Sequence, residues 1–143
     1  MPIASMATDL DGAFEACRLE TAEWAKTFYL GTLLLPLEKR RAIWAIYVWC
    51  RRTDELMDSA EAQSRSVEEL AERLDRWEQQ TRDLFNGRVS NDLDAVMADT
   101  LERFPQDIQP YLDMIEGQRM DLTWTRYPTF EDLKLYCYRV AGT

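Results

Sequence analysis

Two carboxylates one helical turn apart are the residues of this chain best suited to chemistry. Asp54 and Asp58 are four positions apart, and Arg51 precedes Asp54 by three. On a helix such side chains share one face. Two like charges at this spacing cost about 0.2–0.5 kcal/mol, unless a cation bridges them. The pattern therefore suits a site for a divalent cation and an anionic group.

The segment before these carboxylates makes the pattern more specific. Spacing alone is weak evidence, because other acidic pairs in the chain share it. From Ala42 to Cys50, however, every residue is apolar or aromatic, which predicts a helix buried on every side. Carboxylates that continue such a helix should face a cavity. Buried carboxylates must be paired or bind metal, and Mg²⁺ commonly takes one or two carboxylates plus substrate phosphates.

Simpler interpretations of the same residues stay open at this point. Asp54 and Asp58 could be solvated charges at a helix end, which is the usual place for acidic side chains. Arg51 could form a structural ion pair with Asp54 or Glu55.

The expected helix over residues 37–58 carries two adjacent stripes. Periodicity cannot separate a cavity wall from a packed core that grades into solvent. A pocket that holds an apolar chain at one end and a charged head group at the other would have this layout. The first stripe is Ile43, Ile46, Cys50, Thr53 and Met57, and the second is Trp44, Tyr47, Arg51, Asp54 and Asp58.

Composition excludes several classes of function. The chain has 143 residues, the usual size of one domain, and 46% hydrophobic residues are enough for one core. A formal net charge of -9 argues against nucleic-acid binding. The chain has no histidine, which removes Ser-His and Cys-His catalysis and the usual histidine-containing zinc sites.

Cysteine usage and hydropathy predict the compartment. Cys17, Cys50 and Cys137 are widely spaced without a C-x-x-C pair, which favours reduced structural thiols in an intracellular protein. Residues 1–8 show no signal or transit peptide. No apolar run approaches the roughly 20 residues that cross a bilayer. We expect a cytoplasmic or peripheral membrane protein.

The remaining pattern predicts an all-α fold without strands or repeats. An apolar segment, 28–35, precedes the helix at 37–58. A capping box begins at Ser66, and Gly87 provides a stop. Pro110 is tolerable only in a first helical turn. The expected helices cover residues 9–26, 37–58, 66–87, 90–104, 107–121 and 129–143.

Four blocks of the sequence resemble the squalene and phytoene synthase family, which joins two prenyl diphosphates head to head. They are Ala25–Thr32, Lys39–Asp58, Met114–Gly117 and Tyr136–Thr143. The second and fourth blocks are the specific ones, and the resemblance is greatest to phytoene synthases of bacterial or cyanobacterial type.

The resemblance implies a class I terpenoid-synthase helical fold and a reaction. Two geranylgeranyl diphosphates would condense through prephytoene diphosphate to phytoene, in carotenoid biosynthesis. Mg²⁺, or alternatively Mn²⁺, would be the cofactor, peripheral membrane contact is plausible and nucleic acid is not a partner. The competing interpretations are a squalene or dehydrosqualene synthase that uses farnesyl diphosphate, and a non-catalytic helical interaction module.

The resemblance also implies roles for individual residues. The catalytic set would be Asp54, Asp58, Arg51 and Tyr136, with the two aspartates as metal ligands, Arg51 on the diphosphate and Tyr136 near the carbocation. The substrate-binding set would be Lys26, Thr27, Phe28, Tyr47, Arg51, Val140 and Ala141. These roles agree with elementary chemistry, because cations neutralise a departing diphosphate and aromatic faces stabilise a positive centre.

The chain departs from the family pattern in a few places. Met57 stands where valine or isoleucine is commoner, and Gln118 stands where methionine is frequent. Neither residue is an implied ligand. The family's second aspartate-rich motif follows the segment that matches Val140–Thr143. We therefore expect residues 1–143 to be the N-terminal half of one helical catalytic domain, with little synthase activity alone.

Overall fold

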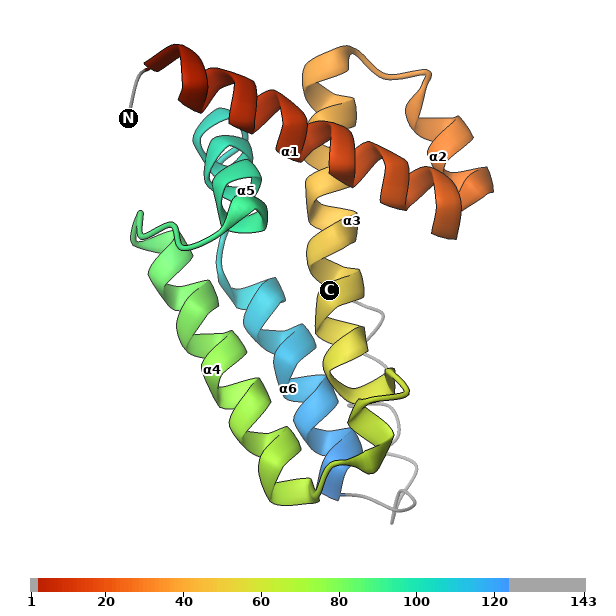
Figure 1. Cartoon of the computed structure of the whole chain (residues 1–143), viewed down its shortest axis with the longest axis vertical. Helices are drawn as coiled ribbons and strands as arrows, with labels where there is room; N and C mark the ends of the chain where they lie inside the picture. The colour runs from red at the N-terminus through yellow and green to blue at the C-terminus, as the bar shows by residue number, and fades with distance from the viewer. Residues whose placement is uncertain (1–2, 124–143) are drawn as a thin grey trace. The chain divides into compact units, whose positions relative to one another are not determined.

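The structure, a computed structural model, describes residues 3–123, which form helices joined by short connections (Figure 1). Within this range no residue lies in a strand, and the all-α prediction is confirmed. None of the helices within residues 3–123 is long and apolar enough to cross a membrane. The elements are α1 (Ile3–Trp24), α2 (Lys26–Thr32), α3 (Leu37–Asp58), η1 (Ala62–Ser64), α4 (Val67–Phe85), α5 (Asp92–Arg103) and α6 (Gln109–Thr123).

The predicted and observed boundaries agree best where the sequence carries stop and start signals. The helix expected at 37–58 is α3, which follows Pro36 directly. The first helix starts at Ile3 rather than near residue 9, and it ends at Trp24. A separate helix, α2, then starts at Lys26, which the sequence did not predict. The helix expected at 129–143 lies outside the described residues.

Local capping explains the starts of α4 and α5. The backbone N–H of Glu69 donates to Ser66 Oγ at 3.2 Å, as the capping box predicts. Asn91, one residue later than the predicted start, accepts from the Asp94 N–H at 2.8 Å. After α4 the chain turns at Gly87, whose φ of 86° suits glycine.

The described chain forms two compact units. The first contains residues 3–51 and 84–106, and the second contains residues 52–83 and 107–123. Since α3 crosses the boundary after Arg51, it contributes its first part to one unit and its last part to the other.

In the first unit α1 packs against α2 and α5 (Figure 1). Buried side chains from these helices and from α3 supply its core, among them Phe14, Cys17, Trp44, Val48 and Met97. The short helix α2 is tied to α3 because Trp44 Nε1 donates to Thr32 Oγ1 at 2.9 Å.

In the second unit α4 and α6 lie side by side (Figure 1). Arg119 of α6 forms ion pairs with Asp75 at 3.0 Å and with Glu78 at 2.6 Å, both on α4. The end of α3 is tied to α4, because Trp77 Nε1 donates to Thr53 Oγ1 at 2.8 Å. Leu74 and Ile115 are fully buried. This unit therefore holds the end of α3 that carries the two aspartates.

Candidate functional site

One face of α3 is less buried than the sequence predicts. No residue between Ala42 and Cys50 is exposed, but Ile43, Ile46, Tyr47 and Cys50 are only half-buried. The prediction of a helix buried on every side is therefore wrong for this face. Its residues recur at steps of three and four, so they share one side of the helix. The same side continues to Asp54 and Asp58.

Arg51 is held by two residues of α1. Its Nε lies 3.2 Å from a carboxylate oxygen of Glu20, and its guanidinium lies 3.7 Å from the centre of the Trp24 ring. The sequence suggested Asp54 or Glu55 as partners and missed these two. The only signal was that Glu20 and Trp24 stand four apart and so share a face of one helix. Their contacts fix the guanidinium through charge and through its planar face.

Two predicted substrate-binding residues contact each other in the first unit. The rings of Phe28 and Tyr47 have centroids 5.8 Å apart at an interplanar angle of 35°. Lys26 and Thr27 stand exposed in the first turn of α2. The neighbouring Tyr29 accepts from Arg18 Nη1 at 3.0 Å through its hydroxyl. The segment Lys26–Phe28 is thus set on a helix that contacts both α1 and α3.

The two aspartates differ in their surroundings. Asp54 is half-buried, and its Oδ1 accepts a hydrogen bond from Gln118 Nε2 at 3.0 Å. Gln118 lies on α6 and is only 6% exposed. Asp58 is exposed and is the last residue of α3. The sequence pointed to Gln118 only as a departure from the family pattern, and nothing in its spacing predicted the contact with Asp54.

The donor set at the end of α3 fits a hard cation. Asp54 and Asp58 offer carboxylate oxygens on one helical face, and Mg²⁺ is commonly held by one or two carboxylates together with phosphates and water. Among the described residues no group of three or more His, Cys, Asp or Glu side chains could hold a metal ion. Two carboxylates leave the other coordination positions of such an ion to phosphate oxygens and water. The remaining predicted residues, Tyr136, Val140 and Ala141, lie outside the described residues.

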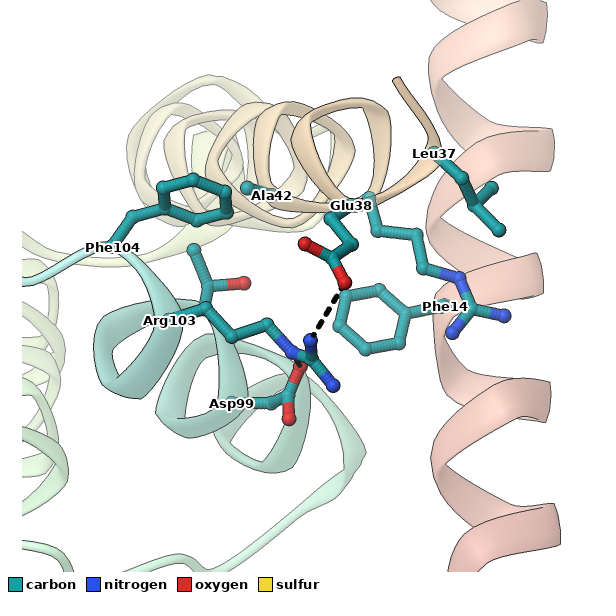
Figure 2. A pocket seen from close by; sticks show the side chains of 9 residues that line it. Phe14, Leu37, Glu38, Ala42, Asp99, Arg103 and Phe104 are labelled. Atoms are coloured by element: carbon teal, nitrogen blue, oxygen red, sulfur yellow. Dashed lines mark hydrogen bonds and ion pairs between the residues drawn. The ribbon is translucent and has the colours of Figure 1, made fainter.

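A cavity of about 180 Å³ in the first unit is lined by α1, α3 and α5 (Figure 2). Figure 2 shows Arg103 turned toward Glu38, to which its Nη1 donates at 3.3 Å, and Arg103 also pairs with Asp99 at 3.0 Å. Arg41 lies over the Phe14 ring at 5.0 Å. Arg103 thus pairs with both carboxylates of this cavity, while Arg41 pairs with Asp11 outside its lining at 3.2 Å. None of the predicted site residues lines the cavity.

A second hollow in the same unit is apolar. It has a volume of about 290 Å³, and half-buried residues of α3 form part of its wall. Little of the surface that lines it is polar, so it suits a hydrocarbon better than a charged group. Its lining is Leu35, Lys39, Ala42, Ile43, Ile46, Phe104 and Gln106.

Comparison with known proteins gives a consistent result. The sequence model of the family described as squalene/phytoene synthase matches residues 21–143. The chain is 57% identical over 142 residues to the 15-cis-phytoene synthase of Synechocystis, covering 99% of the chain and 41% of that protein. It is 59% identical over 134 residues to the chloroplastic phytoene synthase 1 of Arabidopsis thaliana, covering 94% of the chain and 31% of that protein.

Solved structures support the same fold. A dehydrosqualene synthase in complex with a ligand superposes with a TM-score of 0.80 at 31% identity, covering 94% of the chain and 45% of that structure. The squalene synthase HpnC of Alicyclobacillus acidocaldarius gives a TM-score of 0.80 at 28% identity, covering 94% and 49%. The chain spans less than half the length of each of these proteins.

Proposed function

Because the chain belongs to the squalene/phytoene synthase family, we propose that it forms part of a prenyltransferase of phytoene synthase type. The observation that carries this proposal is the placement of Asp54 and Asp58 on one face of α3, within the matched region and after an apolar stretch. The proposed reaction condenses two geranylgeranyl diphosphates into phytoene through prephytoene diphosphate. As the chain covers about two-fifths of the cyanobacterial relatives, we expect little activity from it alone.

In this proposal Asp54 and Asp58 hold Mg²⁺, with Mn²⁺ as an alternative. The bound ion would supply positive charge that neutralises the diphosphate leaving group. Arg51, which comes one turn before Asp54 in the same helix, would contact the diphosphate directly. Lys26 and Thr27 are exposed and available to bind phosphate oxygens.

The apolar part of the substrate needs a different surface. The Phe28 and Tyr47 rings and the hollow beside Ile43 and Ile46 offer hydrocarbon and aromatic area within one unit. Aromatic faces stabilise a positive centre without quenching it. Tyr136, Val140 and Ala141 stay predictions for the same pocket. Peripheral membrane contact also remains a proposal, motivated by the amphiphilic substrate.

The test requires a version of the chain completed at its C-terminus to the length of its relatives. With Mg²⁺, it should convert geranylgeranyl diphosphate to phytoene, detected by chromatography of the hydrocarbon product. Asp54→Asn or Asp58→Asn should lower turnover by at least about 100-fold, because each removes a charge that holds the cation. Full activity of the variant with both aspartates neutralised would refute the assignment.

The same assay separates the competing functions. Two of the solved neighbours are a dehydrosqualene synthase and a squalene synthase. Farnesyl diphosphate is therefore the second substrate to test. A higher kcat/KM with farnesyl diphosphate would move the chain to that class. A completed chain that bound neither diphosphate in the presence of Mg²⁺ would be a helical interaction module.

A further inference from the structure

We propose that Gln118 is a positioning residue, whose buried carboxamide fixes the orientation in which the Asp54 carboxylate meets a divalent cation. This inference rests on the proposed function, because it assumes that Asp54 is a metal ligand. It begins from the hydrogen bond of 3.0 Å between Gln118 Nε2 and Asp54 Oδ1.

Burial makes this hydrogen bond different from others of its kind. Gln118 is 6% exposed, and burying an amide without a partner is costly. Two other glutamines donate to aspartates in the same unit, Gln79 to Asp83 at 3.0 Å and Gln109 to Asp113 at 2.8 Å, but both bonds are exposed. Water can replace an exposed donor, whereas it cannot readily replace the buried one.

Gln118 and Asp54 each have a chain neighbour that contacts α4. Arg119, which follows Gln118, pairs with Glu78 of α4. Thr53, which precedes Asp54, accepts from Trp77 of the same helix α4. Thus side chains of α4 contact the residue next to each partner of the hydrogen bond, which restrains both α6 and the end of α3 at this point.

A fixed donor matters because an aspartate carboxylate turns easily. The final torsion of Asp is broad and roughly two-fold, so helix geometry alone does not set the plane of the carboxylate. A hydrogen bond to Oδ1 does set that plane. A carboxylate accepts at about four positions, so this bond uses only part of its capacity.

The chemical type of the donor also suits the role. A carboxamide is neutral, so it orients Asp54 without cancelling the negative charge that attracts a cation. An arginine or lysine at this position would pair with Asp54 and compete with the metal. Partners of this kind behind a metal ligand typically change metal affinity about 10–100-fold when they are removed.

The experiment measures metal-coupled binding rather than turnover. In the completed chain, a non-reactive geranylgeranyl thiodiphosphate is titrated by calorimetry at a series of Mg²⁺ concentrations. Gln118→Met keeps the volume of the side chain and removes the donor. We expect the Mg²⁺ concentration for half-maximal analogue binding to rise about 10–100-fold. Gln79→Met, which removes an exposed bond of the same type, should leave it unchanged.

A second variant and a second measurement cover loss of folding. Gln118→Asn keeps a buried amide but withdraws it by one methylene, and it should give a shift in the same direction. Thermal unfolding of each variant identifies a purely structural role, which would lower the midpoint and leave the Mg²⁺ requirement unchanged. That result, or an unchanged requirement in both folded variants, overturns the proposal.

Asp54→Asn separates this proposal from the proposed function. If Asp54→Asn abolishes the Mg²⁺ dependence while both Gln118 variants keep it unchanged, Gln118 has no positioning role and the proposed function stands. If Asp54→Asn leaves the dependence intact, or if the unaltered completed chain shows none, the assignment of Asp54 as a ligand fails and the role of Gln118 fails with it.

Discussion

Replacing Asp58 by asparagine should stabilise the chain. Asp58 is exposed and ends α3, where a negative charge meets the negative end of the helix dipole at a cost of about 0.3–1 kcal/mol. It also stands four positions after Asp54, and like charges at that spacing cost about 0.2–0.5 kcal/mol. Removing both costs should raise the free energy of unfolding by about 0.5–1.5 kcal/mol. For a chain of this length, 1 kcal/mol raises the thermal unfolding midpoint by roughly 4 °C.

The same substitution should damage the proposed function. Asp58→Asn removes one of the two proposed ligands, so the completed chain should lose Mg²⁺-dependent binding while it gains stability. Residues that serve a site often carry such a stability cost. Asp54→Asn should act differently, because Asp54 accepts from Gln118. Bonds to charged groups contribute more than neutral ones, and this change should cost about 1 kcal/mol.

Thermal unfolding followed by circular dichroism tests the stability claim. The gain from Asp58→Asn should be largest at low ionic strength and should shrink in 1 M NaCl, where the screening length falls to about 3 Å. Asp92→Asn is the matched control, since Asp92 is exposed in the first turn of α5 and its charge favours the helix. Its midpoint should fall. A lower midpoint for Asp58→Asn, or a gain that salt does not change, would refute the electrostatic reasoning.

Three further predictions concern other contacts. In a double-mutant cycle, Thr53→Val and Trp77→Phe should show a coupling free energy of at least about 0.5 kcal/mol in urea unfolding, since they share a hydrogen bond of 2.8 Å; independent effects would contradict this. Asn91→Ala should cost about 1 kcal/mol by the same measurement, because it removes the cap of α5; an unchanged unfolding free energy would argue against the cap. The guanidinium of Arg73, followed by that of Arg65, lowers the pKa of Glu61 below its ordinary 4.5. This interaction stabilises the fold above pH 4.5 and is lost as the pH falls through the lowered pKa. In an NMR titration Arg73→Met should raise that pKa toward 4.5, and an unmoved midpoint would exclude Arg73 as the cause.

The fold class and most helix positions followed from local sequence signals. Pro36 fixed the start of α3, and Gly87 marked the turn after α4. These signals act within a few residues, because caps, turns and helical hydrogen bonds join positions at most four or five apart. The separate helix α2 was missed because its apolar segment lacks a capping residue: Ala25 precedes it without a side-chain cap.

The identity of the candidate site came from motifs, whereas its supporting contacts did not. The motif around Asp54 and Asp58 indicated a family, which the comparison confirmed. The sequence predicted that Ile43 and Tyr47 are fully buried, whereas both are half-buried. Hydrophobic composition does not reveal which neighbours pack against a helix face.

The sequence by itself determined that this chain is helical, that α3 carries an arginine and two aspartates at helical spacing, and which family it resembles. Only the tertiary structure decided that Glu20 and Trp24 hold Arg51, and that Gln118 holds Asp54. Arg51 and Glu20 are 31 positions apart, and Gln118 and Asp54 are 64 apart. Such pairs meet only when whole helices pack, and packing depends on the combined shape of many side chains rather than on the spacing of a few.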